Sequence, residues 1–208
     1  IVEACDRISD TARAHRRAFL VEVMGRQSGF LAMRAGIAAE ADAIVYGEQG
    51  DCGEDALVEQ LSALLDRCFA PDRKKQRALI VKAEGVPVSS ALLAARLQKH
   101  LDEHHPGIDV RETVLGHVVR GGNPSALDRM IAQRLAFGAV LAVEQGAHDV
   151  MLGWDVPDDF GQATSDSFVR MVTIPEMLTE TERLLDGTSP VVRRRIGLLE
   201  KVKDILAL

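Results

Sequence analysis

The segment RRAFLVEVMGRQSGFLAMRAGIAAEADAIVYGE, residues 16–48, holds two short apolar runs with a helical stretch between them. Residues 18–23 are rich in Phe, Leu and Val and end at Gly25, a pattern typical of a buried strand. Residues 28–41 have the composition of a helix, and a second strand is predicted over 42–48. A strand, a helix and a strand in this order predict two parallel strands joined by a crossover helix.

The same alternation continues along the chain. An amphipathic helix is predicted over 1–15, and further strands over 78–85 and 108–116. The other helices of this part are predicted over 55–69, 88–105 and 125–146. Since the strand runs are nearly all apolar, we expect both of their faces to be covered. These patterns predict an α/β fold: a three-layer, Rossmann-like open parallel sheet flanked by helices.

Signals are weaker after residue 146. A fifth strand is predicted over 147–155, helices near 175–184 and 188–206, and a loop between the strand and the first of these helices. Ser125 and Asp128 are spaced as a capping box at the start of the long helix 125–146.

Composition and charge exclude several classes of protein. The 208 residues carry a formal net charge of −6, which gives no general support for binding nucleic acid or an anionic membrane. No apolar run approaches the roughly 20 residues of a membrane helix. Three cysteines without paired spacing favour a reduced, cytoplasmic protein over a disulfide scaffold.

Polar side chains gather where three predicted strands end. The first strand is followed by Met24-Gly25-Arg26, the third by Glu84-Gly85, and the fourth by His117 and Arg120. Ligands of open parallel sheets bind beyond the carboxyl ends of the strands. Guanidiniums and an imidazole suit a phosphate, and a carboxylate suits sugar hydroxyls. The amides that begin helix 28–41 could point at the same anion.

Each feature also has an ordinary structural interpretation. Strand ends with glycine are common in α/β folds, and a single histidine such as His117 is more often a hydrogen-bonded structural residue. Arg17 could simply begin a strand, and the basic run 72–77 could be a solvated turn.

Longer motifs bring in a family resemblance. VEVMGRQSGFLAMRAGIAAEAD (21–42) resembles the MGR segment of the 6-phosphofructokinases, and LGHVVRGGNPSALDRMIAQRLAFGAV (115–140) resembles their GHxQRGG segment with its following helix. VKAEG (81–85) resembles the strand that ends in the family's glutamate. The resemblance is strong over 1–150, covers the C-terminal half of the family's usual chain, and implies a phosphofructokinase-like fold.

The resemblance implies roles for particular residues. Arg26 would be catalytic, stabilising the phosphoryl group in transfer. Arg17 and Arg111 would reach the sugar phosphate of a neighbouring subunit, which implies a homo-oligomer, typically a tetramer. The implied fructose 6-phosphate contacts are Arg17, Met24, Gly25, Arg26, Glu84, Arg111, His117 and Arg120.

Three departures from the family pattern stand out. Val119 replaces the usual glutamine, and Lys82 adds a positive charge beside the expected sugar site. The third concerns the allosteric nucleotide site, where Ser9 replaces an arginine and Glu40 a glycine. The effector contacts that the resemblance still offers are Arg73, Lys75 and Asp42.

The family's glycine-rich nucleotide segment and its TIDND-type segment do not occur in the 208 residues. The Mg²⁺ ligands and the ATP or pyrophosphate site are therefore expected in another half, and no metal site is expected here. The start at Ile1, inside a predicted helix, suggests either the C-terminal part of a longer protein or a trimmed chain. Residues 1–123 would form the sugar-phosphate lobe, 124–165 would return to the nucleotide lobe, and 166–208 would form a helical C-terminal segment.

The expected function is phosphoryl transfer to the 1-hydroxyl of fructose 6-phosphate in glycolysis, with this chain inactive alone. The alternatives are a truncated sugar-phosphate-binding or regulatory subunit and an interaction subunit with a decayed site.

Overall fold

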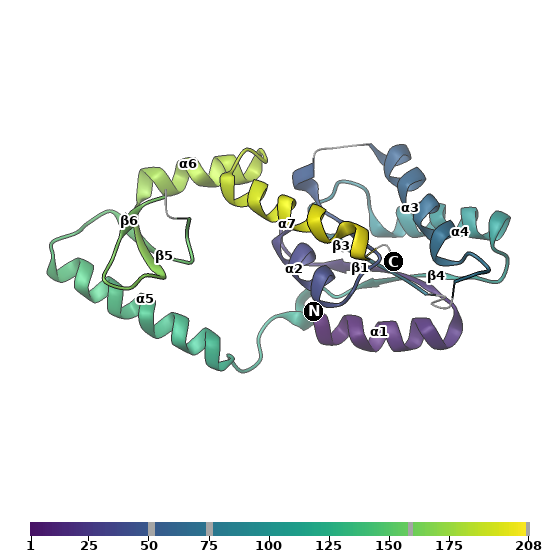
Figure 1. Cartoon of the computed structure of the whole chain (residues 1–208), viewed down its shortest axis with the longest axis horizontal. Helices are drawn as coiled ribbons and strands as arrows, with labels where there is room; N and C mark the ends of the chain where they lie inside the picture. Colours follow the sequence, from purple (N-terminus) through teal and green to yellow (C-terminus); the bar gives the residue numbers. More distant parts are fainter. Residues whose placement is uncertain (50–52, 74–76, 158–159, 207–208) are drawn as a thin grey trace. The chain divides into compact units, whose positions relative to one another are not determined.

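The computed structural model of the chain describes residues 1–49, 53–73, 77–157 and 160–206 (Figure 1). It divides into two compact units. The first unit contains Ile1–Arg120 with Val192–Leu208, and the second contains Gly121–Val191.

The first unit is built on a parallel four-stranded sheet. Its strands are β1 (Ala18–Val23), β2 (Ala43–Val45), β3 (Ala78–Ala83) and β4 (Val110–Val114), in the order β2-β3-β1-β4. The predicted parallel sheet is confirmed, and β1, β3 and β4 are neighbours. Ala18 is in register with Ala78 on one side and Val110 on the other, so the three carboxyl ends lie together.

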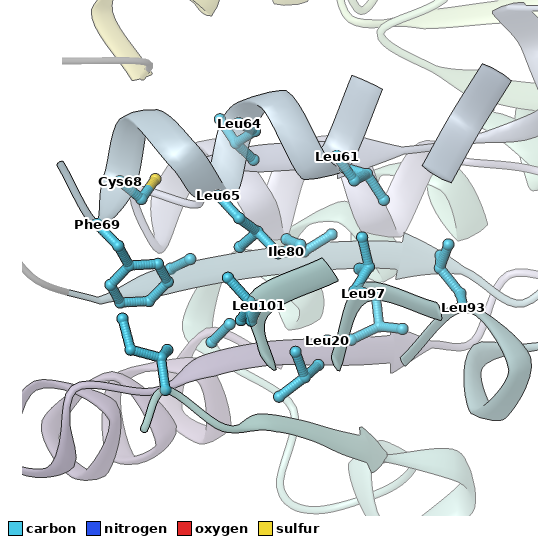
Figure 2. Close-up of a cluster of buried hydrophobic side chains, with 14 of the residues drawn as sticks. Leu20, Leu61, Leu64, Leu65, Cys68, Phe69, Ile80, Leu93, Leu97 and Leu101 are labelled. Atoms are coloured by element: carbon cyan, nitrogen blue, oxygen red, sulfur yellow. The ribbon is translucent and has the colours of Figure 1, made fainter. Parts of the chain in front are cut away.

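Helices cover the two faces of this sheet because strand side chains alternate between them. On one face, Leu20 and Ile80 pack against α3 (Glu54–Cys68) and α4 (Ser90–His104), as Figure 2 shows. On the other face, residues of odd number in β1 and β3 pack against α1 and α2. These helices span Val2–His15 and Phe30–Ala38.

Strand β4 departs from the prediction that the strands are covered on both faces. Val110 is buried under α4, but Arg111, Glu112 and Val114 are exposed. The strand lies at the end of the sheet order and carries two adjacent charged residues, Arg111 and Glu112, and charged side chains are common on edge strands. After β4 the chain forms a short 3-10 helix, η2 (Gly116–Val119).

The second unit has its own antiparallel sheet. The long helix α5 (Ala126–Glu144) starts with the predicted capping box of Ser125 and Asp128. Its strands are β5 (Val150–Trp154), β6 (Gln162–Ala163) and β7 (Val169–Thr173), and their order in the sheet is β5-β7-β6. Helix α6 follows over Ile174–Leu185. The predicted strand near 147–155 is therefore present, but the loop predicted after it is wrong over β6 and β7.

This hairpin is stabilised by side-chain contacts that a local pattern does not show. Arg134 of α5 makes a bidentate ion pair with Asp166, and its guanidinium lies within 5 Å of the Trp154 and Phe168 rings. These contacts explain why a segment with the composition of a loop forms β6 and β7. The last helix, α7, runs over Pro190–Leu206.

Two further expectations concern the membrane and the cysteines. In the described ranges, no helix is both long and apolar enough to cross a bilayer. Cys5 and Cys68 are buried, and Cys52 lies outside the described residues.

Candidate functional site

The turn after β1 is held by a carboxylate from the end of β3. The N–H groups of Gly25 and Arg26 both donate to Oε1 of Glu84, at 2.9 and 2.5 Å. Arg26 has a φ of +51°, in the left-handed region that few residues other than glycine adopt. Because both N–H groups donate to the same carboxylate oxygen, Glu84 stabilises the backbone of the Gly25-Arg26 turn, including the unusual φ of Arg26.

The same contacts set the charge of Glu84. Its pKa is lowered below the ordinary value chiefly by the N–H groups of Gly25 and Arg26, and further by the charges of Arg120 and His117. Glu84 is therefore ionised at neutral pH. Arg120 lines the same pocket as Glu84, and His117 precedes it in η2, where the His117 carbonyl accepts the N–H of Arg120.

Two glycines make the turn possible. A Cβ on Gly85 would lie 2.2 Å from the carbonyl oxygen of Arg26, and one on Gly25 would lie 2.3 Å from that of Ser28. Gly85 therefore lets the end of β3 approach the backbone of the turn after β1.

An open pocket of about 640 Å³ lies at this carboxyl edge, within the first unit. Its charged lining residues are Arg26, Arg34, Glu84 and Arg120. Met24, Gly25 and Val119 line it as well, together with small and apolar residues of α1 and α2, namely Ile1, Val2, Leu31, Ala35 and Ala38. The structure thus brings Met24, Gly25, Arg26, Glu84 and Arg120 to one pocket, whereas His117 is exposed in η2 and is not one of its lining residues.

Comparison with known proteins agrees with this geometry. The family model described as "Phosphofructokinase" matches residues 1–143. The chain belongs to the phosphofructokinase family.

Individual phosphofructokinases support the assignment. The chain is 42% identical to an ATP-dependent 6-phosphofructokinase 1 of Thermus thermophilus over 153 residues, which is 73% of this chain and 44% of that protein. An ATP-dependent 6-phosphofructokinase of Brevibacillus brevis is 41% identical, with 74% and 44% covered. The phosphofructokinase structure from Saccharomyces cerevisiae matches 98% of this chain and 27% of its own, with a TM-score of 0.75 and 26% identity. The chain thus spans less than half the length of these curated relatives.

Two residues predicted for the phosphofructokinase sugar site lie elsewhere. Arg17 precedes β1 and Arg111 is in β4, both near the amino ends of strands whose carboxyl ends form the pocket. Asp109 is close to both, 3.5 Å from Nε of Arg17 and 2.8 Å from Nη2 of Arg111. Within one chain, these arginines do not join the pocket.

The amino end of α2 is not open to an anionic ligand, contrary to the expectation from the sequence. The N–H of Gly29 donates to Oε1 of Glu48 at 2.7 Å, so a carboxylate of the chain occupies that position. A Cβ on Gly29 would lie 2.7 Å from the other oxygen of Glu48. Glu48 has no role assigned from the sequence. Its position just after β2, on the predicted binding edge, was the available signal.

Lys82, a departure from the family pattern, also behaves differently from the expectation. Its side chain is 1% exposed and its Nζ lies 3.1 Å from Oε2 of Glu22. The same oxygen accepts a hydrogen bond from Ser90 at the start of α4. Lys82 does not line the pocket, and its charge is offset by Glu22 on the α4 side of the sheet.

The predicted effector residues are only partly described. Oδ2 of Asp42 accepts the N–H of Leu79 at 2.8 Å and lies 3.6 Å from the buried Arg77. Arg73 lies in the turn before β3, where its N–H donates to Ala70, and Lys75 lies outside the described residues. Asp42 therefore has a structural role, and the effector site stays a prediction.

The residues present do not fit a metal ion. Throughout the described part of the chain, no group of three or more His, Cys, Asp or Glu side chains is placed to hold one. Glu84 is the single acidic residue lining the pocket, and its Oε1 is already bonded to two N–H groups. A hard cation such as Mg²⁺ prefers several oxygen ligands.

Proposed function

We propose that this chain supplies the fructose 6-phosphate site of a phosphofructokinase that forms fructose 1,6-bisphosphate. The observation that carries this proposal is the meeting of Arg26, Glu84 and Arg120 in one pocket, with His117 in the short helix η2 that precedes Arg120. These residues come from the ends of three adjacent strands, in the family's order along the chain.

Each residue has a distinct part in the proposal. Arg120 and His117 bind the phosphate of the sugar, because guanidinium and imidazole N–H groups donate hydrogen bonds to phosphate oxygens. Glu84, with Oε1 engaged by the turn, accepts a sugar hydroxyl through Oε2. Arg26 stabilises charge on the phosphoryl group moving to the 1-hydroxyl.

The site is completed by parts that this chain does not supply alone. Arg17 and Arg111 bind the sugar phosphate held by a neighbouring copy in a homotetramer. Their position away from the pocket of their own chain supports this arrangement. The phosphoryl donor is ATP, because the relatives from Thermus thermophilus and Brevibacillus brevis are ATP-dependent 6-phosphofructokinases. Its site and the Mg²⁺ ligands lie in another half of a cytoplasmic, glycolytic protein.

In this proposal, each of the three segments predicted from the sequence has its own role. Residues 1–123 bind the sugar phosphate, 124–165 pack against the nucleotide lobe, and 166–208 form the C-terminal segment. Helix α5 supports the second assignment because it exposes several large apolar side chains, namely Leu127, Met130, Phe137, Val140 and Val143. We expect no turnover from the 208-residue chain alone.

Calorimetric titration of fructose 6-phosphate into the chain tests the sugar site. We expect weak binding that Arg120→Ala reduces by about tenfold, since it removes a charged hydrogen-bond donor. Arg67→Ala, an exposed arginine of α3 outside the pocket, is the matched control and should bind as wild type. Equal affinities for wild type and Arg120→Ala would contradict the proposal. A full-length protein that binds the sugar but transfers no phosphoryl group would favour the regulatory alternative.

A further inference from the structure

The buried ammonium group of Lys82 has no part in the proposed function. Its side chain is 1% exposed, and its Nζ lies 3.1 Å from Oε2 of Glu22 and 3.4 Å from the carbonyl oxygen of Ala83. In the described part of the chain, Glu22 has no other ion-pair partner. Ser90 also donates to Oε2 of Glu22, but its hydroxyl group carries no charge. Lys82 is therefore the cation that balances the carboxylate of Glu22.

This ion pair lies just before the binding edge of the sheet. Glu22 and Lys82 are in register on the neighbouring strands β1 and β3. Met24 and Glu84, each two residues further along the chain, line the pocket. Two residues of a strand span about 7 Å. Since this distance is shorter than the Debye length of about 8 Å at physiological salt, a net charge on the pair would act on a ligand at the strand ends.

The pair influences how much negative charge the binding edge carries. Glu84 is the single acidic lining residue, against the three arginines of the pocket. This excess of positive charge favours a phosphate. Without a cation beside it, the carboxylate of Glu22 would add a second negative charge close to the ligand, and it would repel the phosphate.

We propose that Lys82 is a positioning residue of the sugar-phosphate site, which holds and neutralises the Glu22 carboxylate so that the pocket keeps its affinity for an anion. The inference rests on the proposed function, because it takes the pocket as the site of the sugar phosphate. Lys82 contacts no ligand in this assignment, since it does not line the pocket.

The test is calorimetric titration of fructose 6-phosphate into the 208-residue chain and three variants. Lys82→Met should weaken binding by about threefold or more, because it leaves Glu22 negative. Glu22→Gln should bind more tightly than wild type, because it leaves Lys82 positive. The double variant Glu22→Gln/Lys82→Met removes both charges and should return to within about twofold of wild type. Structural damage would weaken both single variants, so their opposite directions separate an effect of charge from an effect of packing.

Arg77→Met is the matched control. Arg77 is a 3% exposed cation that lies 3.6 Å from Oδ2 of Asp42, immediately before the amino end of β3. It is five residues from Lys82, or about 17 Å along the chain. Arg77→Met also removes a buried positive charge, but beyond the range of unscreened interaction with the pocket. It should lower the stability of the fold and leave the affinity for fructose 6-phosphate unchanged.

The outcomes separate this inference from the proposed function. Circular dichroism verifies that each variant is folded during titration, and if Lys82→Met does not fold, Glu22→Gln decides. Affinity of Glu22→Gln equal to or below that of wild type would overturn the role of Lys82. So would wild-type affinity in folded Lys82→Met, or a double variant that does not recover, with the proposed function untouched. If wild type does not bind fructose 6-phosphate, the proposed function fails and this inference fails with it.

Discussion

Glu84 serves the fold and the site at once. One carboxylate oxygen holds the turn that carries Arg26, and the same residue lines the pocket together with Arg120. Changing Glu84 should therefore affect the shape of the turn as well as contact with a ligand.

The pH dependence of stability follows from the lowered pKa of Glu84. A carboxyl group whose pKa is lower in the folded chain stabilises the fold above its ordinary pKa, and this contribution is lost as the pH falls through the lowered value. Glu84→Gln should reduce the free energy of unfolding at about pH 7 by about 0.5 kcal/mol, a small value because the side chain is exposed. In urea unfolding the two proteins should converge as the pH falls below the lowered pKa of Glu84. A difference that persists there would contradict an electrostatic origin.

Gly85 has no room for a side chain. Because a Cβ would lie 2.2 Å from the carbonyl oxygen of Arg26, Gly85→Ala must move backbone. We expect a loss of about 1–3 kcal/mol in the free energy of unfolding and weaker sugar-phosphate binding. Gly197→Ala in α7 is the control, since its Cβ meets no atom within 4 Å and alanine favours a helix. Equal stabilities for the two variants would show that the turn can relax.

Among the elements, β1, β3 and α4 are joined by one buried polar cluster. Glu22 of β1 and Lys82 of β3 are in register and ion-paired, and Ser90 of α4 donates to the same carboxylate. The cluster lies at the ends of the two strands that carry Arg26 and Glu84. It fixes the spacing of these strands just before the binding edge.

The two ends of this ion pair should differ in their effect on stability. Glu22→Ala leaves the buried ammonium of Lys82 without a counter-charge and should cost about 3–5 kcal/mol of unfolding free energy. Lys82→Met keeps most of the side-chain volume and leaves Glu22, which is 21% exposed, bonded to Ser90. We therefore expect a loss at least about 2 kcal/mol smaller by urea unfolding. Similar losses would contradict the expected difference between the two partners.

Elements with strong local patterns could be predicted from the sequence. The apolar runs at 18–23 and 78–83 and the capping box at Ser125 depend on neighbouring residues, and all three are present. The hairpin of β6 and β7 depends on Arg134 and Asp166, which are 32 residues apart, and no local pattern could show it. The pairing of Gly29 with Glu48 and the position of Arg34 in the pocket likewise depend on tertiary structure.

At the scale of the whole molecule, charge is unevenly distributed. An acidic chain carries a pocket lined by three arginines, so a sugar phosphate is attracted by a local field against a repulsive background. Raising NaCl from about 50 to about 500 mM should weaken fructose 6-phosphate binding several-fold, because salt screens exposed charges. Titration at both salt concentrations measures this effect. An affinity independent of salt would argue against recognition by the exposed guanidiniums.

The carboxylate of Glu48 at the start of α2 has a practical consequence for handling the protein. Sulfate or phosphate from a buffer often settles on free helix amides, but here that place is already taken by the chain itself. A buffer anion that competes with the sugar must therefore do so at the guanidiniums. Competition between inorganic phosphate and fructose 6-phosphate would therefore report binding at the guanidiniums, without a contribution from the start of α2.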